Sequence, residues 1–136
     1  MRKYLPTFSD LVDRMSIVML KSIFIADHHD EYIKERGLIE HDIDLILKEK
    51  DYRVTAADIR ALMGVMLANH YIWVNESKAR EGGSEQDKLL KLTHSINGCR
   101  NTAKNKLAQA LGDRRDFKID CFAAELIKEF GNWDAL

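Results

Sequence analysis

Apolar residues recur at helical spacing along most of this chain. Four long segments have the pattern, at residues 8–25, 28–49, 56–80 and 85–111, and a shorter one follows at 119–130. No segment alternates between apolar and polar positions over enough residues to predict a strand. The pattern therefore predicts an all-α fold, with four long helices in an up-and-down bundle and a shorter C-terminal fifth helix.

Polar signals mark the expected helix ends. A Ser or Thr followed three residues later by Asp can cap a helix start, and this spacing occurs at Thr7-x-x-Asp10, Thr55-x-x-Asp58 and Ser84-x-x-Asp87. Glycine readily adopts the left-handed conformation that ends many helices, and two of the predicted helices are followed by Gly82-Gly83 and by Gly112. We expect residues 1–136 to form one helical-bundle domain.

The predicted helices differ in how far their apolar residues extend around the helix. Residues 8–25 are apolar nearly all round and residues 56–80 are broadly apolar, so we expect both in the centre of the bundle. Residues 28–49 have one narrow apolar stripe among charged positions, which is typical of an outer helix.

Composition narrows the class of protein. Hydrophobic residues make up 46% of the chain and the net charge is −1, which argues against a general nucleic-acid binder. No apolar run is long enough to span a membrane, and the first residues lack the apolar core of a signal peptide, so we expect a cytoplasmic location. Cys99 and Cys121 have no metal-binding spacing and are expected to be reduced and buried.

Charge is unevenly distributed along the chain. Residues 27–58 carry ten acidic and five basic side chains, whereas residues 88–118 carry eight basic and two acidic ones. An acidic second helix and a basic fourth helix could pair within the domain, between two copies of the chain, or around a ligand. A homodimer through the apolar helices is a further expectation from the pattern.

The fourth predicted helix has an unusual polar face. Three asparagines and two cations share this stripe, namely Asn97, Arg100, Asn101, Lys104 and Asn105. Asparagine is a mediocre helix former, and three of them cost about 1–2 kcal/mol relative to alanine. An Arg fork and a Lys charge suit phosphate, and Asn amides can bind a base or sugar edge.

The third predicted helix offers polar residues that could face this stripe. Asn69, Trp73 and Glu76 share one face, and Trp73 could stack on a nucleobase. Our leading hypothesis is that a phosphate-bearing or nucleotide-like ligand binds in a polar pocket between the helices. The predicted ligand-binding residues are Asn97, Arg100, Asn101, Lys104, Asn69, Trp73 and Glu76. The alternative is a polar network that sets the register of the helices, or a solvated face.

Enzyme signatures are missing from the sequence. The ExxE and ExxD pairs of all-α nucleoside triphosphate pyrophosphatases do not occur, nor do the Glu-x-x-His pairs of di-iron bundles or a glycine-rich phosphate loop. We therefore predict no metal site and no cofactor, and the sequence favours a binding protein over an enzyme. A metal-dependent nucleotide phosphohydrolase using Asp13, Glu40, Asp44 or Glu76 stays as an alternative.

Residues 8–21 contain the pairs Asp13-Arg14 and Ser16-Ile17 and end at Lys21, and Asn97-x-x-Arg100 gives a second match. In these residues the chain resembles small all-helical proteins of unknown function from bacteria and tailed phages. The resemblance implies an all-helical fold and a phage origin. Two roles would fit such an origin: sequestration of nucleotides, and inhibition of a host protein or capture of its nucleotide messenger. The second role corresponds to a protein–protein interaction module that acts through a helix face.

Overall fold

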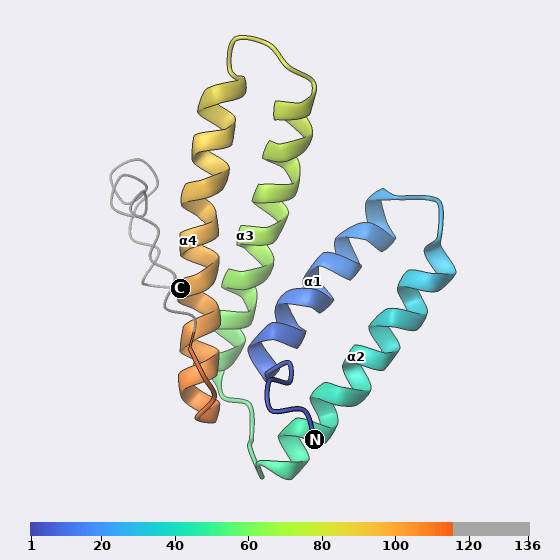
Figure 1. Cartoon of the computed structure of the whole chain (residues 1–136), viewed down its shortest axis with the longest axis vertical. Coiled ribbons are helices and arrows are strands. Elements are labelled where there is room, and N and C mark those ends of the chain that lie inside the picture. The colour runs from blue at the N-terminus through green and yellow to red at the C-terminus, as the bar shows by residue number, and fades with distance from the viewer. Residues whose placement is uncertain (116–136) are drawn as a thin grey trace.

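The computed structural model describes residues 1–115, which form four α-helices and no strand (Figure 1). The helices are α1 (Phe8–Phe24), α2 (His29–Glu49), α3 (Ala56–Arg80) and α4 (Gln86–Leu111). The predicted all-α class and the four long helices are confirmed, and the helix bounds agree to within one residue. The helix predicted at residues 119–130 lies outside the described residues.

Two of the three predicted capping boxes are present. The Thr7 hydroxyl accepts a hydrogen bond from the backbone of Asp10, and the Thr55 hydroxyl accepts one from the backbone of Asp58, with the Asp side chain bonding back in each case. The box predicted at Ser84 is wrong, because α4 begins one residue later and has Glu85 as its N-cap. Asp87 is therefore the second residue of the helix, one position too early to complete a box.

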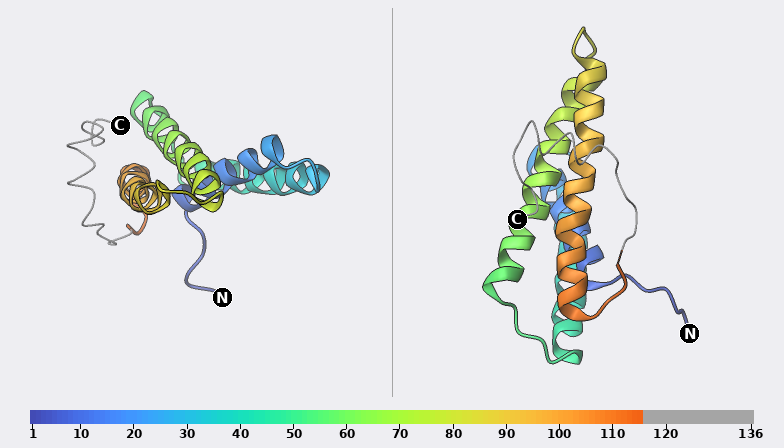
Figure 2. Two further views of the ribbon diagram at one scale, coloured as in Figure 1. Left: turned by 90° about the horizontal axis from the view of Figure 1, so that it is seen from above. Right: turned by 90° about the vertical axis from the view of Figure 1, so that its left-hand side faces the viewer.

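The four helices form two antiparallel hairpins, α1–α2 and α3–α4 (Figure 1). Seen from above, α1 and α2 extend together to one side of the α3–α4 hairpin (Figure 2). α1 packs against the other three helices, whereas α2 packs along α1 without comparable packing against α3 or α4. The predictions of a central first helix and an outer second helix are confirmed.

The core lies where the start of α1 packs against the first half of α3 and the last half of α4. Its largest cluster of buried apolar side chains consists of Phe8, Val12, Ala61, Val65, Ala103, Leu107 and Leu111, and half-buried residues of α2 cover it on one side. A smaller cluster between α3 and α4 includes Ile96 and Cys99, so the predicted burial of Cys99 is confirmed. Cys121 lies outside the described residues.

α3 is central only in part. Its side toward α1 and α4 is buried, but Ile59, Met63 and Tyr71, which belong to the segment expected in the centre of the bundle, are exposed. The physical reason is the position of α2, which covers α1 and leaves the outer side of α3 without a described helix against it. None of the four described helices combines the length and the apolar character needed to cross a bilayer.

Candidate functional site

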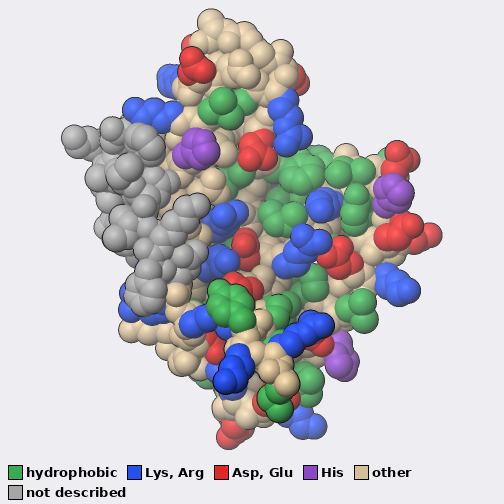
Figure 3. Space-filling view, viewed as in Figure 1, with side chains coloured by type: hydrophobic (Ala, Val, Ile, Leu, Met, Phe, Trp, Pro, Cys, Tyr) green, Lys and Arg blue, Asp and Glu red, His purple; other side chains and the backbone are tan. Residues whose placement is uncertain are grey.

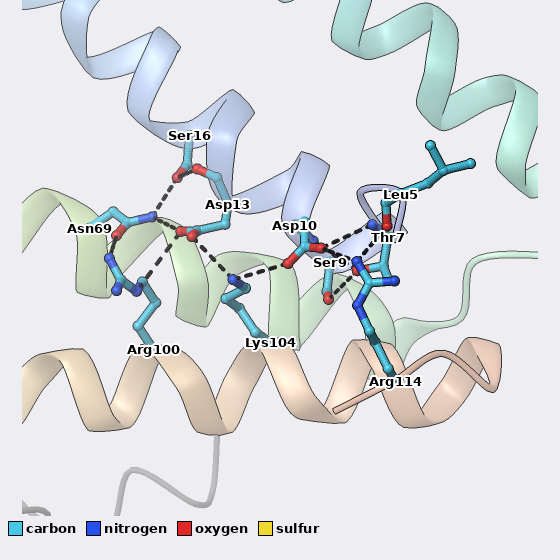
Figure 4. A network of polar contacts seen from close by, with 10 residues as sticks. All are labelled: Leu5, Thr7, Ser9, Asp10, Asp13, Ser16, Asn69, Arg100, Lys104 and Arg114. Carbon is cyan, nitrogen blue, oxygen red and sulfur yellow. Dashed lines mark hydrogen bonds and ion pairs between the residues drawn. The ribbon is translucent and has the colours of Figure 1, made fainter. Parts of the chain in front are cut away.

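A row of polar side chains lies between α1 and α4 and continues past the start of α1 (Figure 4). α1 contributes Asp10, Asp13 and Ser16, α3 contributes Asn69, and α4 contributes Arg100 and Lys104. We call the group Asp13, Ser16, Asn69, Arg100 and Lys104 the polar seam. It joins α1 to both helices of the α3–α4 hairpin.

Asn69 is the centre of the polar seam. Its side chain is almost completely buried, at 1% exposure. The amide nitrogen donates to Asp13 Oδ1 at 2.7 Å and to Ser16 Oγ at 2.6 Å, and the amide oxygen accepts from Arg100 Nη1 at 3.1 Å. Both ends of the amide are therefore satisfied, which is the condition for burying an asparagine at low cost.

Asp13 carries the negative charge of the polar seam. Lys104 Nζ lies 3.4 Å from Asp13 Oδ2, and Arg100 Nε lies 3.9 Å from Asp13 Oδ1. All three side chains are largely buried, so their charges are screened less by water than those of a surface pair. Desolvation offsets much of the attraction, so such ion pairs add little net stability. The guanidinium of Arg100 is thus engaged by Asn69 and Asp13 of the same chain.

Asp10 continues the row at the start of α1. Its carboxylate caps the helix through the backbone N–H of Thr7 at 3.0 Å and lies 3.5 Å from Lys104 Nζ and 3.4 Å from Arg114 Nη2. Burial raises the pKa of Asp10, but the hydrogen bonds with Thr7 and the charge of Lys104 outweigh burial and lower the pKa below its ordinary value. Asp10 is therefore held in its charged form.

Arg114, which follows α4, contacts the segment that precedes α1. Its guanidinium donates to the backbone carbonyl of Leu5 and lies over the ring of Tyr4, 3.7 Å from the ring centroid. A cation placed over an aromatic face is attracted by the ring quadrupole. These contacts bring residues 4–10 beside the last turns of α4.

A hollow of about 230 Å³ lies at this junction. It is lined by Tyr4, Thr7, Ser9, Asp10, Lys104, Asn105, Arg114 and Arg115. Three cations and one carboxylate line it, so its wall carries a net positive charge, and the first turn of α1 adds the positive end of a helix dipole. On the face shown in Figure 3, Lys and Arg side chains gather beside the centre of the molecule with Asp and Glu side chains between them. We call this hollow the basic hollow.

The predicted site residues fall into separate places. Asn69, Arg100 and Lys104 are brought together in the polar seam. Trp73 packs against the ring of Phe24, with the centroids 6.1 Å apart, at the end of α1. Glu76 lines a different hollow near the α3–α4 turn.

Asn97 and Asn101 are half-buried on α4, and neither lines the basic hollow. Of the seven predicted residues, Lys104 alone is among the residues that line it. In the polar stripe of α4, Arg100 and Lys104 thus belong to the polar seam, and Lys104 and Asn105 line the basic hollow.

Sequence reasoning assigned no site role to Asp10, Tyr4 and Arg114, and it named Asp13 both as a polar residue of the first helix that needs a partner and as a residue of the phosphohydrolase alternative. One signal could have found the carboxylates. Asp10 and Asp13 are three residues apart on one helix, and Arg100 and Lys104 are four apart on another, so each pair lies on one face and the opposite charges can meet.

Among residues 1–115, no three His, Cys, Asp or Glu side chains are grouped so that they could hold a metal ion. Glu40 and Asp44, two carboxylates of the phosphohydrolase alternative, are exposed on α2. Asp13, a third, is engaged by Asn69 and Lys104.

Comparison of the chain with protein-family models, with curated proteins and with solved structures finds no match. The resemblance of residues 8–21 to helical proteins of bacteria and tailed phages therefore stays a prediction.

Proposed function

We propose that this protein is a small cytoplasmic binding protein that holds a phosphate-bearing, nucleotide-like ligand in the basic hollow. The observation that carries the proposal is the convergence of Lys104, Arg114 and Arg115 on one hollow that contains a single carboxylate, Asp10. This net positive charge in a recessed place is suited to an anionic small molecule.

Five of the lining residues have a use in such a site. The guanidinium of Arg114 offers a planar set of donors for phosphate oxygens, and Lys104 adds a point charge. Thr7 and Ser9 place hydroxyls at the first turn of α1, where the helix dipole also favours an anion. Tyr4 is 80% exposed at the rim, and its ring could stack on a nucleobase.

The polar seam has a supporting role in this proposal. Lys104 bridges Asp13 in the polar seam and Asp10 beside the basic hollow, at 3.4 Å and 3.5 Å. Asn69 and Arg100 hold Asp13 in place from the other side. They fix the position of Lys104 and do not contact the ligand themselves, so the ligand site is narrower than the polar stripe of α4.

Thermal denaturation of the full chain against a panel of nucleotides tests the proposal. Nucleoside mono-, di- and triphosphates should raise the melting temperature, whereas the corresponding nucleosides should not, because the phosphate supplies the charge. Inorganic phosphate forms a separate arm that shows whether the base adds affinity. If no nucleotide raises the melting temperature, the proposal is wrong.

Matched variants locate the site. Lys104→Met and Arg114→Gln should each weaken binding about tenfold or more by calorimetry, since each removes a charge-assisted hydrogen bond. Lys88→Met removes the same charge from an exposed position in the first turns of α4 and serves as the control. Equal weakening by Lys88→Met would show that only net charge matters and that the basic hollow is not the site.

A second candidate function is protein–protein interaction through a helix face. The exposed apolar side chains on the outer side of α3 favour it. Sequestration of a nucleotide and binding to a host protein both suit the phage origin that the first helix implies. The two functions use different parts of the molecule and can be tested separately.

A further inference from the structure

The outer side of α3 carries an apolar stripe. Ile59, Met63 and Leu67 follow one another at four-residue steps, and 48%, 61% and 55% of their surfaces are exposed. Residues at this spacing lie on the same face of a helix. An exposed apolar stripe of several large side chains in a soluble protein commonly marks an interface.

Basic residues border this stripe. Arg60 and Lys78 are exposed on the same side of α3, about five helical turns apart. Glu76 is the one acidic residue between them in the sequence, and helical geometry puts it on the opposite side of the helix. The partner of this face should therefore be apolar along its centre and acidic along one border.

The exposed face of α2 has these properties. Leu38 and Leu45 lie one heptad apart and are 63% and 45% exposed, and α2 packs on α1 through a neighbouring side, about 100° round the helix, where Ile39 is buried. Exposed acidic residues border the leucines on one side, namely Glu31, Asp42 and Glu49. Lys34 and Lys48 border them on the other side.

The two faces also match in length. Glu31 and Glu49 are separated by the same number of residues as Arg60 and Lys78, about five turns in each case. The leucines lie between the two acids, as Met63 and Leu67 lie between the two basic residues. Two helices laid side by side could thus pair both ends while burying the apolar centre.

The two faces do not meet within one chain. α2 packs along α1 and has no comparable packing against α3, since the α1–α2 hairpin extends to one side of the α3–α4 hairpin (Figure 2). A second copy of the chain can supply the missing face. In a twofold dimer the α2–α3 contact then forms twice, once in each direction.

We infer that two copies of this chain associate through the leucine face of α2 on one copy and the apolar stripe of α3 on the other. Glu31 pairs with Lys78 and Glu49 pairs with Arg60 across the interface, in an antiparallel arrangement that brings Leu45 beside Met63. Neither Leu45 nor Met63 lines the basic hollow, so the inference stands independently of the proposed ligand.

Two single variants of the full chain test the interface. Leu45→Glu and Met63→Lys each bury an unpaired charge in both copies of the contact, so each should raise the dimer dissociation constant by at least about 100-fold. Sedimentation equilibrium measures the constant, and circular dichroism checks that the helices are intact. Leu90→Glu introduces the same charge at an exposed leucine of α4, outside both faces, and should leave the constant unchanged.

Mixing the two variants gives the sharper result. A mixed dimer has one contact of native composition, and in its other contact the introduced acid faces the introduced base. The mixture should therefore associate at concentrations where each variant alone is a monomer.

Three results would overturn the inference. The first is a monomeric parent chain at all accessible concentrations, with the stripe covered by residues 116–136 of the same chain or by another protein. The second is a parent dimer that Met63→Lys dissociates while Leu45→Glu does not, since α3 would then pair with α3. The third is a mixture that stays monomeric.

Discussion

The inner side of α3 buries a polar side chain, whereas the outer side exposes apolar side chains. On the inner side the amide of Asn69 is buried and makes three hydrogen bonds to α1 and α4. On the outer side Met63 and Leu67 are more than half exposed. The difference shows that burial in this protein depends on which helix stands opposite, because a polar group with partners can be buried and an apolar group without a neighbour cannot.

Asn69→Ala should have the largest effect, a loss of about 2–4 kcal/mol in the free energy of unfolding. The substitution removes three hydrogen bonds and leaves Asp13 and Arg100 short of partners in a largely buried place. Urea denaturation followed by circular dichroism measures the loss. A loss below about 1 kcal/mol would mean that water replaces the amide and that the inner side of α3 tolerates change as well as the outer side.

Arg100→Met should lower the free energy of unfolding by about 1–2 kcal/mol, because Asn69 loses a donor while Lys104 still compensates Asp13. The same variant should change nucleotide affinity by less than about twofold, since Arg100 does not line the basic hollow. Calorimetric titration beside urea denaturation separates the two quantities. If Arg100→Met weakens binding as much as Lys104→Met, Arg100 contacts the ligand and the polar seam is part of the site.

Asp58 is buried in the first turn of α3, and its ionisation makes the stability of the protein depend on pH. Burial raises its pKa, but hydrogen bonds from Thr55 and from Tyr52 Oη outweigh burial, so the pKa lies below the ordinary carboxyl value. A lowered folded pKa stabilises the protein above about pH 4, and this stability is lost as the pH falls through the folded pKa. Acid should therefore destabilise the chain below about pH 4.

Asp58→Asn isolates this contribution. The variant should cost about 1 kcal/mol at pH 7, where the parent has a charged cap, and less at pH 3. Denaturation of parent and variant at several pH values measures the difference. A cost that is the same at both pH values would show that the carboxylate charge does not contribute.

Leu67→Ala, on the outer side of α3, should have the smallest effect, at most about 0.5 kcal/mol, because more than half of the side chain is already in water. The measurement uses a protein concentration low enough that copies do not associate. A loss of about 2 kcal/mol under these conditions would show that another part of the same chain covers the stripe, and the contrast between the two sides of α3 would disappear.

The sequence predicted the candidate site unevenly. Lys104 and Arg100 stood out because a helix rarely gathers cations and asparagines on one stripe. Asp10 did not stand out as a site residue, since acids at the start of a helix also occur for capping alone. Trp73 and Glu76 shared a face with Asn69 on the helix, but α1 ends near Trp73 and its Phe24 ring covers that residue. Residues on one face of a helix need not have the same neighbour, because the neighbouring helix can end part of the way along that face.

By itself the sequence determined the four described helices and most of their ends, because periodicity and capping depend on residues within a few positions of one another. Ser84 shows the limit, since α4 begins one residue later than its capping signal predicts and has Glu85 as its N-cap. Only the tertiary structure decided that α2 covers α1 and leaves the outer side of α3 exposed. It also decided that Asp13 and Asn69 engage Arg100, because such contacts depend on the docking of whole helices.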